Sequence, residues 1–366
     1  MRSVSCFALV SVFLCAVTTQ GHTSAKPSIA SIENQASVLY RQGKYAEAFA
    51  AYQECAKRGS AHSQSILGYM YATGKGTEKN SALALEWASK AAAQDDVEAQ
   101  NMLGYMYMNG AGTRPDHAHA LIWYGKAAHK GNAIAENSLG LLYYRGDGTP
   151  QDFARAQAWF MRAAEQGYEP AQNNLGSMYF NGAGVAQDYF KAREWLTKAA
   201  DQGNAKAQWM LGQMYANALG VPRDYAKAIT WYSKAAQQQF AAAQVDLGVM
   251  YFYGMGTAQD RSQSFAWFSK AAAQGLASAQ TNLGVMYMKG LGISPDEAKA
   301  REWLQRAAIQ QNADAKEWLA VIDRQSQPLQ QQEPSVTFSS IARVVTPGDS
   351  DPMRNKTETS GISDLQ

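Results

Sequence analysis

Cysteine is scarce in this chain of 366 residues. Cys6 and Cys15 lie in the apolar segment at the start of the chain, and the remainder carries only Cys55. A single cysteine cannot form an internal disulfide, so a disulfide framework is excluded and the fold must be held by packing. Cys55 stands where later parts of the sequence carry Ala91 and Ala127, which indicates a buried small residue rather than a reactive thiol.

Charge is also limited, because charged residues make up 17% of the chain and the net charge is +2. A balance this close to neutral lacks the electrostatic footprint of a nucleic-acid-binding protein, so we expect no nucleic-acid partner. The apolar segment at residues 6–17 is shorter than the ~20 residues that a membrane span requires. No later segment is apolar enough to span, so we expect no membrane span in the mature chain.

The N-terminus has the features of a secretory signal. Arg2 precedes the apolar segment, and small residues follow it at positions 19–25. We therefore interpret residues 1–25 as a cleaved signal peptide and expect an exported, extracytoplasmic protein, periplasmic or secreted in a bacterium. A lipoprotein anchor is disfavoured, because Leu14 stands before Cys15 where a small residue is required.

A unit of 36 residues recurs seven times without insertion or deletion, from Leu67-Gly68 to Leu283-Gly284. A fixed period of this length is typical of a stacked repeat array. In such an array each repeat packs only on its neighbours, so 366 residues need not form one large core. The sequence therefore predicts a solenoid.

Each repeat is predicted to form two helices, as the fourth one illustrates. Residues 169–179 form helix A, 181–184 the turn, and 188–201 helix B. A glycine in the middle of helix A, such as Gly176, costs up to about 1 kcal/mol relative to alanine, so we expect another helix backbone to approach closely there. An Asx residue caps each helix B, and a tryptophan in every helix B is predicted to join neighbouring repeats.

The ends of the array differ from its centre. We assign residues 26–58 to an N-terminal repeat similar to a tetratricopeptide repeat, 59–310 to the seven full repeats, and 311–324 to a C-terminal capping helix. Residues 325–366 are rich in Gln, Ser, Pro and Thr, and we expect them to be disordered. The apolar segment 336–345 is either a short docking segment or an incidental apolar patch, with the patch favoured.

The recurring pattern is Ala-x-Ala-Gln-x-x-Leu-Gly-x-Met-Tyr, then Gly-x-Gly-x-x-x-Asp-x-x-x-Ala, then Trp-x-x-Lys-Ala-Ala. Clear instances lie at residues 171–179, 182–192 and 195–200. It resembles the Sel1-like repeat family over residues 59–320. The resemblance implies an all-α, right-handed α/α superhelical solenoid that serves as an adaptor or scaffold. Secreted bacterial members are linked to envelope signalling, exopolysaccharide systems and host contacts.

No grouping of residues indicates catalysis, so we predict that the chain is not an enzyme and needs no cofactor or metal. His117 and His119 are two residues apart and diverge on a helix, unlike metal ligands that share a face. A cysteine-rich branch of the family is described as β-lactamase-like and has a disulfide in each repeat. This chain lacks such cysteine pairs, so that activity is not carried over.

Helix A usually lines the concave face of such arrays. Binding residues are therefore predicted in those columns of equivalent helix A positions where the residue type varies between repeats. Asparagines in one column could hydrogen-bond an extended peptide, and Trp209 is the best single anchor. The alternative is that these side chains only pack on the next helix A. For the column that contains Tyr144, Phe180 and Phe252, packing and binding have even odds. The predicted set is Asn101, Asn137, Asn173, Trp209, Tyr69, Tyr105, Tyr144, Phe180 and Phe252.

The sequence thus favours an exported scaffold that binds a protein or peptide partner through its concave face, and the family resemblance links such a scaffold to envelope signalling or host interaction. Two alternatives belong to other classes. One is an enzyme acting on cell-wall or β-lactam substrates, for which no nucleophile and base are found. The other is a glycan-binding scaffold, in which exposed Tyr and Trp rings would stack on sugars.

Overall fold

The computed structural model describes residues 27–325, which contain seventeen α-helices of 13 residues each and no β-strand. The predicted signal peptide at 1–25 and the tail beyond residue 325 lie outside the described residues. The helices are α1 (Ile29–Arg41), α2 (Tyr45–Lys57), α3 (Ala61–Thr73), α4 (Ser81–Ala93), α5 (Val97–Asn109), α6 (His117–His129), α7 (Ala133–Arg145), α8 (Phe153–Glu165), α9 (Glu169–Asn181), α10 (Tyr189–Asp201), α11 (Ala205–Asn217), α12 (Tyr225–Gln237), α13 (Ala241–Tyr253), α14 (Arg261–Ala273), α15 (Ala277–Lys289), α16 (Glu297–Ile309) and α17 (Ala313–Gln325).

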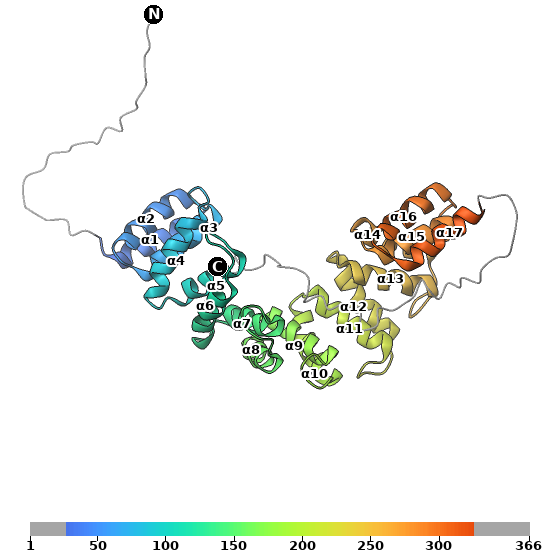
Figure 1. Ribbon diagram of the computed structural model, residues 1–366, viewed down its shortest axis with the longest axis horizontal. Coiled ribbons are helices and arrows are strands. Elements are labelled where there is room, and N and C mark those ends of the chain that lie inside the picture. Colours follow the sequence, from blue (N-terminus) through green and yellow to red (C-terminus); the bar gives the residue numbers. More distant parts are fainter. Residues whose placement is uncertain (1–26, 326–366) are drawn as a thin grey trace, which may run out of the picture.

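The helices form a solenoid in which each one packs on the next in the chain. The helix pairs follow an arc from α1 at one end to α17 at the other (Figure 1). Odd-numbered helices also touch the next odd-numbered helix, as α3 and α5 do. These helices therefore line the inner, concave side of the arc, and the predicted all-α solenoid is confirmed. No helix between residues 27 and 325 is long and apolar enough to cross a membrane.

The helix ends follow the sequence signals. The side chain of Asp188 accepts hydrogen bonds from the backbone N–H groups of Phe190 and Lys191 and so caps α10. The odd-numbered helices of the full repeats end in a left-handed residue, such as Gly182 with φ +67°. Repeat five has Ala218 at this position, with φ +59°, a conformation that is strained for any residue with a Cβ.

The glycines inside helix A do approach the partner helix closely, but mainly through a side chain rather than the expected backbone. A Cβ at Gly140 would lie 2.7 Å from Cδ1 of Phe160, and one at Gly212 would lie 2.5 Å from Cδ1 of Tyr232. The expected backbone contact is also present in part, since a Cβ would lie 3.2 Å from backbone atoms of α4 at Gly68 and 3.1 Å from a backbone atom of helix B at Gly176 and Gly284. The reason for the side-chain contacts is that helix B carries a large residue directly after its tryptophan in every full repeat except the first, and the glycine makes room for it.

The helix B tryptophans pack on the preceding repeat, as predicted. Trp123 of α6 contacts the core built by α4 and α5, and Trp159 of α8 contacts the core built by α6 and α7. Each ring is also covered by the lysine or arginine three residues later, at 3.9–4.7 Å from the ring centroid. These cation–π contacts shield the exposed part of each ring.

A column of buried glutamines provides polar links between repeats that the sequence analysis did not assign. Nε2 of Gln172 donates to the carbonyl of Ala164 at 3.2 Å, and Oε1 of Gln172 accepts from Gln202 at 2.8 Å. The same pair of bonds recurs at Gln208 and Gln244. Their constant place in the Ala-x-Ala-Gln motif was the available signal, because a buried polar residue requires partners.

Repeat three has a carboxylate in this column. Glu136 is fully buried and lies 3.0 Å from the guanidinium of Arg162, and it accepts a hydrogen bond from Gln166 at 2.6 Å. Burial raises the pKa of Glu136, and Arg162 opposes that shift. The arginine thus compensates locally for the exchange of an amide for an acid.

Candidate functional site: the inner face of the solenoid

The predicted binding residues lie on the inner face, but most of their side chains are less exposed than predicted. Tyr69, Tyr105 and Trp209 are half-buried and remain on the surface. The other six predicted residues are buried, with exposures between 2% and 7%: Asn101, Asn137, Asn173, Tyr144, Phe180 and Phe252. These six are therefore part of the packed interior and are not open binding positions, because side chains of neighbouring helices cover them.

Two of the buried or half-buried side chains bond to the next odd-numbered helix. Oδ1 of Asn137 accepts from Nδ2 of Asn174 at 2.9 Å, and Nε1 of Trp209 donates to Oδ2 of Asp246 at 2.7 Å. The two bonds join equivalent positions, since each runs from helix A to a residue 37 positions further on. Part of the predicted binding column therefore joins repeats, and one edge of the Trp209 indole is already occupied.

The carboxyl group of Asp246 has an unusual environment on this face. Burial raises its pKa to about 7, and the hydrogen bond from Trp209 lowers it only in part. The nearby Tyr232 phenol is buried, and its pKa is raised well above the usual value, partly by the charge of Asp246. A carboxyl with this pKa changes charge near neutral pH.

The ring columns fill the space between repeats in the middle of the array. Tyr144 meets Phe153 edge-on at 5.2 Å between ring centroids, and Phe180 meets Tyr189 in the same way at 5.5 Å. Phe252 has the guanidinium of Arg261 5.7 Å from its ring centroid. In each case a residue near the end of helix A contacts the first residue of helix B.

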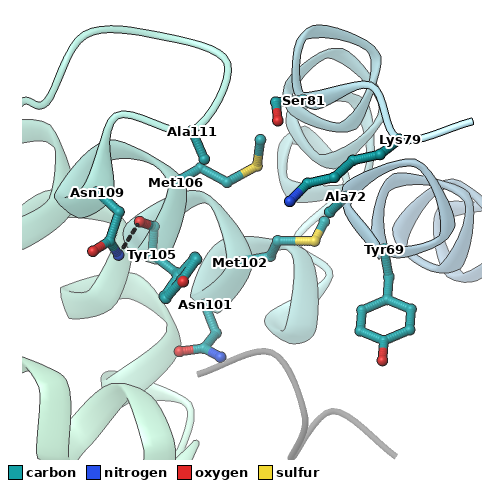
Figure 2. A pocket seen from close by; sticks show the side chains of 10 residues that line it. All are labelled: Tyr69, Ala72, Lys79, Ser81, Asn101, Met102, Tyr105, Met106, Asn109 and Ala111. Carbon is teal, nitrogen blue, oxygen red and sulfur yellow. Dashed lines mark hydrogen bonds between the residues drawn. The ribbon is translucent and has the colours of Figure 1, made fainter. Parts of the chain in front are cut away.

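The first repeat leaves this space open. A pocket of about 120 Å³ lies between α3, the start of α4 and α5. Figure 2 shows its lining, with Met102 and Met106 at the centre and Lys79 extending across it. The full lining is Tyr69, Ala72, Lys79, Ser81, Asn101, Met102, Tyr105, Met106, Asn109 and Ala111. The pocket thus brings together three residues predicted from the sequence: Tyr69, Tyr105 and Asn101.

Asn101 has an incomplete set of hydrogen bonds. Its Oδ1 atom is buried and has no hydrogen-bond partner within residues 27–325, and the same holds for Oδ1 of Asn173. A buried acceptor without a donor costs about 1–3 kcal/mol. Asn101 also lines the pocket, although its Oδ1 atom is not itself exposed there.

Next to this pocket lies a cluster that the column analysis missed. Nζ of Lys75 donates to the hydroxyl oxygens of Tyr40 at 2.9 Å and Tyr69 at 3.4 Å, and it also lies over the ring of Tyr45. These hydrogen bonds raise the pKa of Lys75. The lysine fixes the Tyr69 ring at the mouth of the pocket. It was missed because Lys75 occupies the variable position between the two turn glycines of repeat one, and Tyr45 belongs to the N-terminal repeat.

The histidines that the sequence singled out have ordinary roles. Nδ1 of His119 lies 2.7 Å from Oδ2 of the helix-capping Asp116, and its ring stacks on Tyr107. No group of three or more His, Cys, Asp or Glu side chains in the described part of the chain is placed to hold a metal ion.

The fold and this face define the class, a helical-repeat protein of the kind that forms protein-interaction scaffolds. Seven consecutive Sel1 repeats match the family description, at residues 61–96, 97–132, 133–168, 169–204, 205–240, 241–276 and 277–312. The chain belongs to the Sel1 repeat family.

The solved structures similar to it include the following two. One is a protective antigen present in uropathogenic Escherichia coli strains and displaying the same fold, with 40% identity over 76% of this chain and a TM-score of 0.71. This chain spans 60% of the antigen. The other is a Sel1 repeat protein from Oxalobacter formigenes, with 33% identity over 81% of this chain and 89% of that one, and a TM-score of 0.64. A comparison with curated proteins gives no match.

Proposed function

We propose that this protein is an exported, non-catalytic scaffold that binds an extended segment of a protein partner along the inner face of its solenoid. The observation that carries the proposal is the cluster of half-buried Tyr69 and Tyr105 around a pocket on that face. Half-buried aromatic side chains beside a pocket are typical anchors of protein interfaces. The related Escherichia coli protein is described as a protective antigen, which supports a location outside the cytoplasm.

The test is site-specific photocrosslinking in cells that produce the full chain. A photoreactive phenylalanine analogue replaces Tyr105 on α5 or, as the matched control, Ile122 on α6, whose side chain is 52% exposed. We expect a partner protein crosslinked from position 105 and not from position 122. Crosslinks from 122 alone, or from neither position, would refute binding on the inner face.

Export is tested separately by determining the N-terminal residue of the chain recovered outside the cytoplasm. We expect residues 1–25 to have been removed. A chain that stays in the cytoplasm with residues 1–25 attached would contradict the proposed location.

The tryptophans of helix B do not favour the glycan-binding alternative. Each ring has one face covered by a cation, as Lys126 covers Trp123 at 4.0 Å. The rings also pack on the preceding repeat, as Trp123 does on the core of α4 and α5, so little free ring face is left for stacking on a sugar.

A further inference from the structure

We infer that the pocket between α3 and α5 binds an aromatic side chain of the partner, and that an acidic residue beside this side chain pairs with Lys79. The inference deepens the proposed function and rests on it. The pocket lies where repeat one has two small residues and other repeats have two large side chains that contact each other.

The repeats supply the internal comparison. At the two positions that hold Tyr144 and Phe153 in repeat three, and Phe180 and Tyr189 in repeat four, repeat one holds Ala72 and Ser81. Both small residues line the pocket of about 120 Å³. The walls otherwise keep apolar character, from Met102 and Met106 of α5. A ring supplied from outside would regain the packing that the chain's own rings provide in the middle of the array.

The floor of the pocket suits an aromatic side chain. Met102 and Met106 of α5 form this floor, and Asn101 belongs to the lining but keeps its Oδ1 atom buried. Methionine sulfur at the floor makes favourable contacts with ring edges. A ring inserted here therefore gains sulfur–ring contacts at the apolar floor of the pocket.

The charge of Lys79 favours an acidic residue next to the aromatic residue of the partner. Within the described part of the chain, Lys79 is the one charged residue of the lining, and it has no ion-pair partner there. Its ammonium extends across the pocket (Figure 2), where it meets the face of an inserted ring or an adjacent carboxylate. A basic residue next to the aromatic one would be repelled.

The experiment uses the full chain with ¹³C-methyl-labelled methionine, because Met102 and Met106 line the pocket. The probe is a peptide with Asp-Phe between Gly-Ser flanks, and matched peptides carry Ala for Phe or Lys for Asp. We expect the Met102 and Met106 signals to shift with the Asp-Phe peptide, while the signal of the distant Met250 stays. Each altered peptide should bind at least ~10-fold more weakly.

The decisive variant is Ala72→Phe, which builds into repeat one the ring that Phe180 provides in repeat four. It should abolish the shifts at Met102 and Met106. The matched control is Ala216→Phe, in which the same exchange is made at the equivalent position of repeat five. This control should bind the peptide as the unchanged chain does, and both variants should keep the helical circular dichroism spectrum.

Three outcomes would overturn the inference. One is that Met102 and Met106 do not respond to the peptide. Another is equal binding of the peptide with Ala in place of Phe, or binding that survives Ala72→Phe. The third is a clear gain in peptide affinity with Phe338→Ala, which would identify the chain's own segment at 336–345 as the occupant.

The result separates this inference from the proposed function. If a partner still crosslinks from position 105 when Ala72 is replaced by phenylalanine, the pocket is not its anchor and the inner-face scaffold stands. If no partner crosslinks from position 105 in the unchanged chain, the scaffold proposal itself fails.

Discussion

Replacing Gly140 by alanine tests why a glycine recurs in the middle of helix A. The new Cβ would lie 2.7 Å from both Cδ1 and Cε1 of Phe160, a ring that is fully buried. Overpacking of this kind costs about 1–3 kcal/mol, whereas the change from glycine to alanine in a helix gains up to about 1 kcal/mol. We therefore expect a net destabilisation of about 1–2 kcal/mol.

The chain offers a matched control in Gly125, which lies inside α6 with no atom within 4 Å of a Cβ built there. Gly125→Ala should therefore stabilise the protein by about 0.5–1 kcal/mol. The two variants make the same chemical change inside an α-helix of 13 residues, so the opposite signs isolate the contact with the Phe160 ring.

A double-mutant cycle identifies the contact directly. Phe160→Ala alone leaves a cavity and should cost about 3–5 kcal/mol. Combined with Gly140→Ala it should cost less than the sum, with a coupling energy of about 1–3 kcal/mol, because the new methyl group then meets no ring.

The assay is urea unfolding followed by circular dichroism, together with hydrogen exchange of α7 and α8. Exchange is needed because repeat arrays can unfold in parts, so that one global transition does not describe them. If Gly140→Ala is as stable as Gly125→Ala, or if the cycle shows no coupling, the argument that the ring requires the glycine is refuted.

Two further predictions concern the fifth and sixth repeats. Ala218→Gly should raise the unfolding midpoint, with a gain of about 1 kcal/mol, because the left-handed conformation at φ +59° suits glycine; a lower midpoint in thermal melts would contradict this. Asp246 has a pKa of about 7 in the folded chain against 3.8 for an ordinary aspartate, so the folded state holds the extra proton and stability falls as pH rises from about 4 to about 7. Because each pKa unit is worth about 1.4 kcal/mol and Asp246 keeps some contact with solvent, we expect a loss of about 1–2 kcal/mol. Asp246→Asn keeps an acceptor for Trp209 and should remove this loss, and equal pH profiles of the two proteins in thermal melts would refute the assignment.

The fold was largely readable from the sequence, and the reason is local. The 36-residue period, the capping Asp188 and the left-handed Gly182 act within one or two turns of helix, so their effects do not depend on distant parts of the chain. Trp123 could be assigned to the joint between repeats because every copy carries it. The Gln172 column shared this regularity, and its burial explains why it recurs.

The site could be read only in part, because exposure on the inner face depends on how closely consecutive odd-numbered helices approach. That spacing follows from the packing of whole repeats and not from any periodic column. It buries Asn137 and Phe180, and it leaves Tyr105 at the surface. The sequence by itself determined the helices, their order and their joints, whereas the tertiary structure alone decided that Ala72 and Ser81 leave a pocket beside Asn101.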